Sequence, residues 1–162
     1  MNLSTLTRIG WCVLLGSSLF AADKYAGPRP SKPDLPYLLH ADQLVPTEVV
    51  MAREEPRKED LAYIVTGAAA GVKTPLAGPI FIMQADKLIP EKLSLYRFEV
   101  KNGNREVFFS KKKRKESAKA HRLTVTRLAE GLFRIEVYDS LENGEYGLSP
   151  DGDNRVFCFQ VY

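Results

Sequence analysis

The chain has 162 residues, of which 44% are hydrophobic and 27% are charged, and its formal net charge is +3. This is an ordinary globular composition, and the length suits one domain. The sequence contains neither a Gly-Lys-Ser/Thr nor a Gly-x-Gly-x-x-Gly motif, which excludes the common nucleotide-binding signatures. We therefore expect a protein that is not an enzyme and needs no cofactor.

The first 21 residues are predicted to be a secretory signal peptide. Arg8 supplies a positive charge, residues 9–20 form an apolar run, and Ala21 and Ala22 offer a cleavage site. A retained membrane anchor is the alternative, but a spanning helix needs ~20 apolar residues, more than this run provides. We therefore expect a secreted or periplasmic protein without a transmembrane segment in its mature part.

Residues 22–36 form a proline-rich leader, with Pro28, Pro30, Pro33 and Pro36 spread among polar residues. Such a segment is extended and semi-rigid, so it serves either as a spacer or as an edge lying along the domain. Residues 37–162 are predicted to form the folded domain.

Several strands are expected in the first half of this domain. The apolar alternation predicts a strand at about 47–54, and the charged run 53–60 is typical of a solvated turn. A second strand follows at 61–66. The small residues of 67–78 predict a long connecting loop, and the unbroken apolar run 80–83 predicts a strand buried on both faces.

A β-hairpin is predicted over residues 93–110, because two runs rich in aromatic and β-branched residues flank a turn at 102–104. Two turn types fit this stretch. One is a type I′ loop over Asn102-Gly103, and the other is a type II′ loop over Gly103-Asn104.

Charge pairing across the hairpin favours the type II′ loop. The type I′ register places Glu99 opposite Glu106, whereas the type II′ register places Lys101 opposite Glu106. In either register five apolar side chains share the face that we expect to be buried: Tyr96, Phe98, Val100, Val107 and Phe109.

Two further strand pairs are predicted towards the C-terminus. Residues 123–128 and 132–138 alternate around a turn, and residues 145–148 and 155–162 form the last pair. The side chains expected to point inward from the first pair are Phe133, Ile135 and Val137. Turn signals at this spacing, without an amphipathic helix, predict an all-β antiparallel sandwich of seven to nine strands.

The last strand pair resembles the end of uncharacterised secreted bacterial β-sandwich proteins of immunoglobulin-like type. The resemblance lies in residues 141–148 and 156–161; the usual pattern is Leu-x-Pro-Gly-Glu-Tyr followed by Phe-x-Val, and here Asn143 replaces the proline. It implies a structural role, in which glycine permits the turn and Tyr146 packs and anchors it, and it implies no active site.

The most unusual polar feature is a basic segment at 111–122, with seven basic residues and one acidic residue. Without Arg8, the chain has 22 basic and 20 acidic residues, so everything outside this segment carries −4. The candidate anion-binding residues are Lys111, Lys112, Lys113, Arg114, Lys115, Lys119 and Arg122. Possible partners are an envelope protein or an anionic polymer, including a glycan or lipid surface.

Two alternatives for this segment remain. The first is a solvated loop whose lysines discourage aggregation between sheet edges. The second, sequence-specific binding of nucleic acid, is disfavoured because aromatic residues do not interleave the basic ones.

Candidates for catalysis and metal binding are few. His40 and Asp42 are two residues apart and can share a strand face, and His121 is the only other histidine. Cys158 lies in an apolar strand. We expect it to be buried, to form no intramolecular disulfide and not to act as a nucleophile. These residues do not make a hydrolytic triad or metal site by spacing alone.

The acidic residues give two weaker candidates. A glycosidase-like pair requires two of four carboxylates to meet across a hairpin: Glu48, Glu54, Glu55 and Asp60. The turn 151–154 offers closely spaced oxygen ligands for calcium, but it lacks the glutamate of an EF-hand. We favour solvated charges and a plain Asp-Gly turn, and we expect neither catalytic residues nor a metal site.

Overall fold

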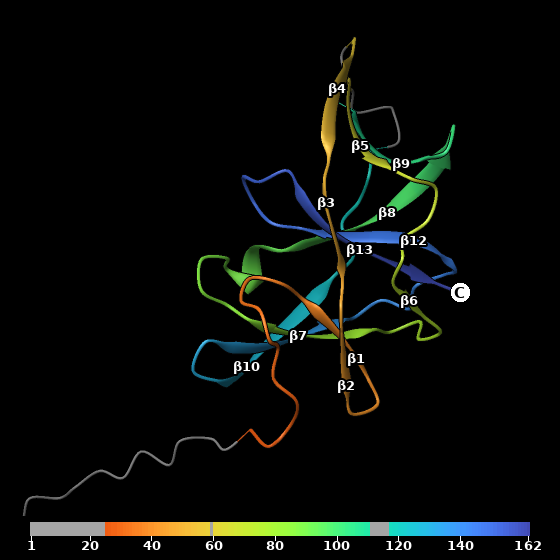
Figure 1. Ribbon diagram of the computed structural model, residues 1–162. Helices are drawn as coiled ribbons and strands as arrows, with labels where there is room; N and C mark the ends of the chain where they lie inside the picture. The colour runs from red at the N-terminus through yellow and green to blue at the C-terminus, as the bar shows by residue number, and fades with distance from the viewer. Residues whose placement is uncertain (1–24, 59, 111–116) are drawn as a thin grey trace, which may run out of the picture.

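The polypeptide forms two β-sheets in a computed structural model that describes residues 25–58, 60–110 and 117–162. Within this part of the chain there are thirteen strands and one short 3-10 helix, η1 (Pro90–Lys92). The five-stranded sheet has the order β10 (Leu123–Ala129), β11 (Leu132–Val137), β7 (Ile80–Gln84), β1 (Tyr37–His40) and β2 (Gln43–Pro46). The eight-stranded sheet has the order β3 (Glu48–Met51), β13 (Arg155–Val161), β12 (Gly144–Ser149), β8 (Ser94–Lys101), β9 (Asn104–Ser110), β5 (Asp60–Thr66) and β4 (Arg53–Arg57), with β6 (Lys73–Thr74) beside β13 (Figure 1).

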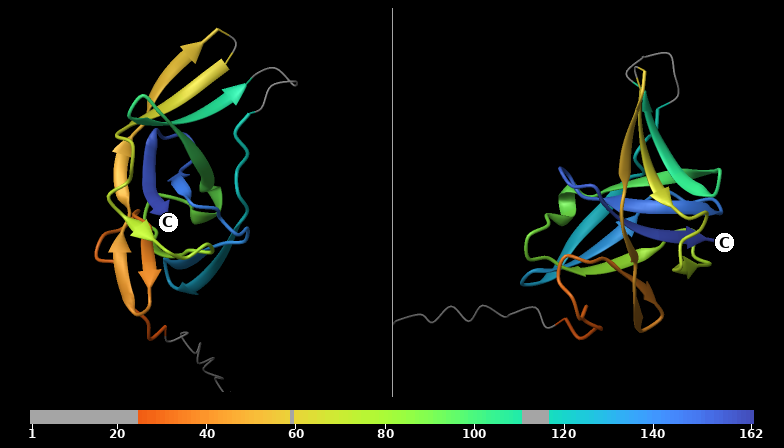
Figure 2. Two further views of the ribbon diagram at one scale, coloured as in Figure 1. Left: turned by 90° about the vertical axis from the view of Figure 1, so that its right-hand side faces the viewer. Right: turned by 45° about the horizontal axis from the view of Figure 1, so that its top comes forward.

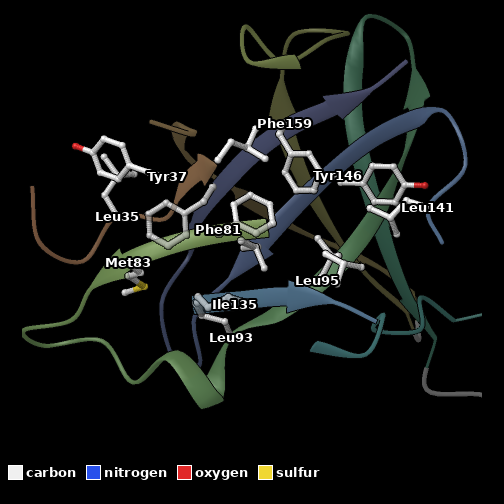
Figure 3. Packing of buried hydrophobic residues seen from close by; sticks show 14 of the residues in the cluster. Leu35, Tyr37, Phe81, Met83, Leu93, Leu95, Ile135, Leu141, Tyr146 and Phe159 are labelled. Atoms are coloured by element: carbon white, nitrogen blue, oxygen red, sulfur yellow. The ribbon is translucent and has the colours of Figure 1, made fainter. Parts of the chain in front are cut away.

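The main hydrophobic core lies between the two sheets (Figure 3). Phe81 of β7 meets Phe159 of β13 edge to face at 5.1 Å between ring centroids, and Phe159 stacks on Tyr146 of β12 at 5.7 Å. All three side chains are almost completely buried. The predicted all-β class with antiparallel sheets is confirmed and the arrangement is sandwich-like, although the described residues form more strands than the seven to nine predicted.

The eight-stranded sheet curls because β8 changes partner along its length. The stretch from Ser94 to Phe98 pairs with β12, whereas residues 99–101 pair with β9. Strands β9, β5 and β4 therefore continue the sheet at an angle, and the β4–β5 hairpin projects beyond the body of the molecule (Figures 1 and 2). The curled sheet encloses a second, smaller core, which includes Phe98, Val107, Val156 and Cys158.

Strands β2, β3 and β4 follow one another along one side of the molecule (Figure 1). They pair in turn with β1, β13 and β5, so one extended stretch joins both sheets and the projecting hairpin. The chain crosses from one sheet to the other at Thr47, which is buried. The hydroxyl of Thr47 donates a 2.7 Å hydrogen bond to the carbonyl of Pro36 and so fixes this crossing point.

One prediction about this stretch is wrong, and one hairpin was not predicted. Residues 53–60 are not a solvated turn, since Arg53–Arg57 is strand β4 and the chain reverses at Lys58, which has a positive φ of 57°. The β1–β2 hairpin was also not predicted, because Ala41-Asp42 is a weaker turn signal than Asn-Gly. These charged residues can form strand β4 because its pairing with β5 gives hydrogen-bond partners to the backbone N–H and C=O groups.

The turn between β8 and β9 is also not the predicted one. Asn102 and Gly103 both have positive φ, 50° and 75°, which is the conformation of a type I′ loop. Glu99 accordingly lies opposite Glu106. The type II′ prediction is therefore wrong, although it avoided this pair of like charges.

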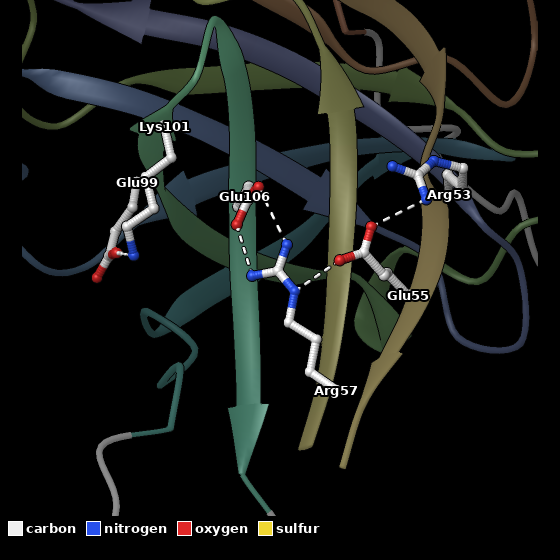
Figure 4. Close-up of polar contacts among 6 residues, drawn as sticks. All are labelled: Arg53, Glu55, Arg57, Glu99, Lys101 and Glu106. Atoms are coloured by element: carbon white, nitrogen blue, oxygen red, sulfur yellow. Dashed lines mark hydrogen bonds and ion pairs between the residues drawn. The ribbon is translucent and has the colours of Figure 1, made fainter. Parts of the chain in front are cut away.

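Ion pairs with other residues offset the repulsion between Glu99 and Glu106 in the observed register (Figure 4). The guanidinium of Arg57 donates two hydrogen bonds to Glu106, at 3.0 and 3.3 Å, and a third to Glu55 at 2.7 Å. The ammonium of Lys101 pairs with Glu99. Each carboxylate of the opposed pair thus has its own cation, which the sequence of the hairpin alone does not reveal.

Most of the remaining strand predictions agree with the structure. The run 80–83 lies in β7, and Phe81, Ile82 and Met83 are buried on both faces. The predicted 123–138 and 145–162 pairs are β10–β11 and β12–β13. Of the side chains expected to point inward, Ile135 and Val137 are buried, and Phe133 is half-buried.

The end of the proline-rich leader packs against the domain. The carboxylate of Asp34 accepts hydrogen bonds of 2.9–3.0 Å from the backbone N–H groups of residues 86–88. Its own N–H donates to the carbonyl of Gln84 at 2.8 Å, and the next two residues, Leu35 and Pro36, are buried. The leader thus becomes part of the folded domain from Asp34 onward.

Candidate ligand-binding cleft

A cleft of about 570 Å³ opens on the inner face of the curled sheet. Its walls come from β4, β5, η1, β8, β9, β12, β13 and the turn between β12 and β13. It lies beside the second core, because Phe98, Val107 and Val156 belong to both. At its base, any side chain at Gly147 would approach Val156 and Phe98 within 2.4 and 2.7 Å, so glycine permits this close packing.

Aromatic side chains from three strands form one wall of the cleft. Tyr63 of β5 and Tyr96 of β8 both meet Phe109 of β9 edge to face, with ring centroids 5.8 and 5.2 Å apart. All three rings are half-buried, and the buried ring of Phe98 lies on the same face of β8 as Tyr96. Except for Tyr63, these aromatic residues come from the predicted buried face of the hairpin. On that face Phe98 and Val107 are buried, but Val100 is 51% exposed.

The rim of the cleft is polar and carries a negative charge. It includes the carboxylates of Glu54, Asp151 and Asp153 and the ammonium of Lys92. Burial raises the pKa of Tyr63, and the adjacent Glu54, which is also hydrogen-bonded to Tyr63, raises this pKa further. Three carboxylates and one amine among the lining residues give the rim an excess of negative charge.

The turn predicted as a weak calcium candidate, residues 151–154, forms part of this rim. The carboxylate of Asp153 accepts a hydrogen bond from the backbone N–H of Arg155 at 2.8 Å and from its Nε at 2.6 Å. The backbone bond is the main reason that the pKa of Asp153 is lowered. Among the residues that the structure describes, no group of three or more potential metal ligands is assembled.

A buried charge cluster lies farther along the same curled face. Arg105 of β9 is only 1% exposed. Its Nη2 donates to the carboxylate of Glu48 at 2.9 Å, and its Nε donates to the carbonyl of Gly67 at 3.0 Å. Its Nη1 lies 3.9 Å from the carboxylate of Glu145, which is itself 4% exposed.

The same cluster fixes the loop 67–78, which the sequence predicted as a simple connection. The N–H of Ala70 donates to Glu145 at 2.8 Å, and the N–H of Gly71 donates to Glu48 at 2.7 Å. Burial raises the pKa of Glu145. Sequence reasoning missed this cluster, because its members are far apart in the chain and each lies in an ordinary strand or loop pattern.

The predicted anion-binding residues are not brought together in the part of the chain that the structure describes. Lys111 to Lys115 lie outside that part, and Lys119 is exposed. Arg122 donates to Asp139 at 3.0 Å through Nη2 and lies 4.0 Å from the ring centroid of Tyr138. Anion binding by this segment stays a prediction.

The candidate catalytic residues lie outside the cleft. His40 is at the end of β1, and Asp42 is in the following turn; both are exposed. The N–H of His121 donates to the carbonyl of Leu95, and its ring packs edge to face against Tyr146. Cys158 is fully buried, and burial raises the pKa of its thiol to about 12, as expected for a structural cysteine.

The four carboxylates considered as a glycosidase pair have separate environments. Glu48 binds Arg105, and Glu55 binds Arg53 and Arg57. Asp60 accepts a 2.8 Å hydrogen bond from the hydroxyl of Ser110. The remaining carboxylate, Glu54, is the one that lines the cleft.

Searches for related proteins add no functional information. No family model, no curated protein and no solved structure matches the chain. In residues 25–58, 60–110 and 117–162, no helix has the length and apolar character needed to cross a membrane.

Proposed function

We propose that the chain is a non-catalytic binding module, secreted or periplasmic, with an interaction role at the cell envelope. Its binding site is the cleft in the curled sheet. The observation that carries this proposal is a concave site of about 570 Å³ whose aromatic wall is left half-exposed. Ligand sites typically have this size and combine an apolar lining with a few polar groups.

The surroundings of the potentially reactive side chains support binding rather than catalysis. Cys158 is buried with a protonated thiol, and the described histidines lie away from the cleft. A general base must lie within hydrogen-bond reach of its substrate, and a cysteine nucleophile must be accessible as a thiolate. Of the carboxylates considered for catalysis, three bind other protein groups: Glu48, Glu55 and Asp60. Glu54 lines the cleft, and in this proposal it binds the ligand.

An immunoglobulin-like type for the sandwich is part of the same proposal. The hydroxyl of Tyr146 donates a 2.8 Å hydrogen bond to the carbonyl of Glu142, four residues upstream. Immunoglobulin-like domains often anchor a strand in this way, with a tyrosine bonded to the backbone a few residues before it. This bond supports the resemblance of the last strand pair to that fold type.

Site-specific photo-crosslinking in cells tests the proposed function. Ser94 lines the cleft, and Thr126 is exposed on β10 of the other sheet. With benzoylphenylalanine in place of Ser94, we expect an adduct of defined mass in the envelope fraction. The same residue in place of Thr126 is the matched control and is expected not to give that adduct. Absence of an adduct from position 94, or identical adducts from both positions, would overturn the proposal.

A further inference from the structure

We propose that the cleft binds a cationic group carried on an apolar stem, namely an alkylammonium. This inference rests on the proposed function and names the ligand class of the same site. The group can belong to a free quaternary amine or to a lysine side chain of a partner, since both carry a positive charge on an apolar stem.

The orientation of the aromatic rings is the first observation behind this inference. The planes of Tyr63 and Tyr96 stand at 85° and 89° to the plane of Phe109. Both tyrosine rings therefore stand across the plane of Phe109, and such a wall suits a compact group better than a flat sugar ring. The face of an aromatic ring carries negative potential, so a cation within about 6 Å of a ring centroid is attracted.

The charge of the rim is the second observation. Asp153 is already paired with Arg155, which leaves Glu54 and Asp151 against Lys92. The rim therefore still has an excess of negative charge that complements a cation and opposes an anion. Glu54 lies opposite Tyr63 in the pairing of β4 with β5, and its negative charge raises the pKa of the Tyr63 phenol, so a carboxylate stands beside this ring.

Apolar side chains in the cleft can bury the stem of such a ligand. Beneath the three rings the cleft is lined by apolar side chains, including Phe98, Val107 and Val156. Methylene or methyl groups of an alkylammonium can cover this surface, while the charge stays near the carboxylates. A small, strongly hydrated inorganic cation lacks the apolar part and would leave that surface exposed.

Titration followed by NMR tests this inference with defined probes. The ¹⁵N-labelled chain, isolated after export, is titrated with choline and with Nα-acetyl-lysine methylamide at constant ionic strength. The neutral isostere of choline, 3,3-dimethylbutan-1-ol, and N-acetylglucosamine are the comparison ligands. We expect both cations to shift the amide signals of cleft residues, and the neutral isostere to bind roughly tenfold more weakly.

Substitutions in the cleft provide the matching controls. Tyr96→Leu removes a ring but keeps an apolar side chain, and Glu54→Gln removes a charge at an exposed position. Each is expected to weaken choline binding by about three- to tenfold. Tyr138→Leu and Glu130→Gln change exposed residues outside the cleft and are expected to leave binding unchanged.

The possible outcomes separate this inference from the proposed function. Equal binding of choline and its neutral isostere would overturn the role of charge, and binding of the sugar alone would overturn the ligand class. If neither cation shifts the cleft signals while position 94 still forms its adduct, the ligand class is wrong but the binding module stands. Loss of that adduct overturns both.

Discussion

Arg105 is a buried charged residue that connects three parts of the fold. It is buried and binds Glu48 of β3 and the carbonyls of Thr66 and Gly67, so it joins β9 to the long loop and to the strand that crosses between sheets. A buried guanidinium costs solvation energy that ion pairs and hydrogen bonds must offset, and Arg105 makes these bonds through Nε and Nη2, while Nη1 has only the 3.9 Å ion pair with Glu145. Its partners are therefore as important for folding as the residue itself.

Removing the charge of Arg105 is expected to be strongly destabilising. Arg105→Met leaves the carboxylate of Glu145 buried without a cation, which should lower the free energy of unfolding by about 3–5 kcal/mol. Urea unfolding at neutral pH measures this loss. Arg97→Met removes the exposed pair with Glu142 and should cost less than about 1 kcal/mol. Similar losses for both variants would contradict the buried role of Arg105; if Arg105→Met does not fold, adding Glu145→Gln should restore folding.

Glu145 is expected to make stability depend on pH. Burial raises the pKa of Glu145 above its ordinary value of 4.5, so the folded state holds this proton more tightly than the unfolded chain does. Stability contributed by this group therefore falls as the pH rises from 4.5 to the higher pKa of the folded state. We expect the wild type to lose stability relative to Glu145→Gln across that window in urea unfolding at constant ionic strength. A difference that grows in the opposite direction would contradict this assignment.

At the level of single elements, the sequence predicted the strands in which apolar and polar residues alternate strongly. It did not predict the register in which these strands pair. The sequence correctly located the β8–β9 hairpin, because aromatic and β-branched residues flank an Asn-Gly turn. It did not indicate the register, because that depends on Arg57 reaching Glu106 from β4. Strand β4 itself was missed, since its residues are charged rather than apolar; alternate residues Arg53, Glu55 and Arg57 form ion pairs along one face of the strand.

The type I′ register of the hairpin is expected to depend on Arg57. Arg57→Gln should lower the urea midpoint, because Glu99 and Glu106 then face each other with one cation fewer. Adding Glu106→Gln should recover part of the loss, since it removes one of the like charges. Arg53→Gln, which affects only the more exposed bond to Glu55, is the control and should change the midpoint less. An unchanged midpoint in Arg57→Gln would show that the register has another cause.

The basic segment 111–122 is expected to bind an anionic polymer. The chain should be retained on a heparin matrix, and replacing Lys111, Lys112, Lys113 and Lys115 with glutamine should lower the salt concentration of elution. The control replaces four other lysines with glutamine, with the same loss of charge: Lys32, Lys58, Lys73 and Lys87. All four are exposed. Equal effects of both sets would show that net charge, not the basic segment, determines retention.

At the level of the whole molecule, the candidate site arises from the way in which the sheets are joined. β8 pairs with β12 at one end and with β9 at the other, and this change curls the sheet and places Tyr63, Tyr96 and Phe109 in one wall. The sequence predicted Tyr96 and Phe109 on one face of the hairpin. It did not predict the cleft, because Tyr63 and the 151–154 turn join that face only through long-range pairing.

The most direct measurement of the central claim combines position 94 crosslinking with a change in the aromatic wall. Benzoylphenylalanine in place of Ser94 is introduced into the wild type and into the Tyr96→Leu and Tyr138→Leu variants, and the envelope adducts are compared by mass. We expect the yield of the adduct to fall with Tyr96→Leu and to be unchanged with Tyr138→Leu, because only the first change alters the cleft. An adduct of equal yield in all three backgrounds would contradict the cleft as the binding site.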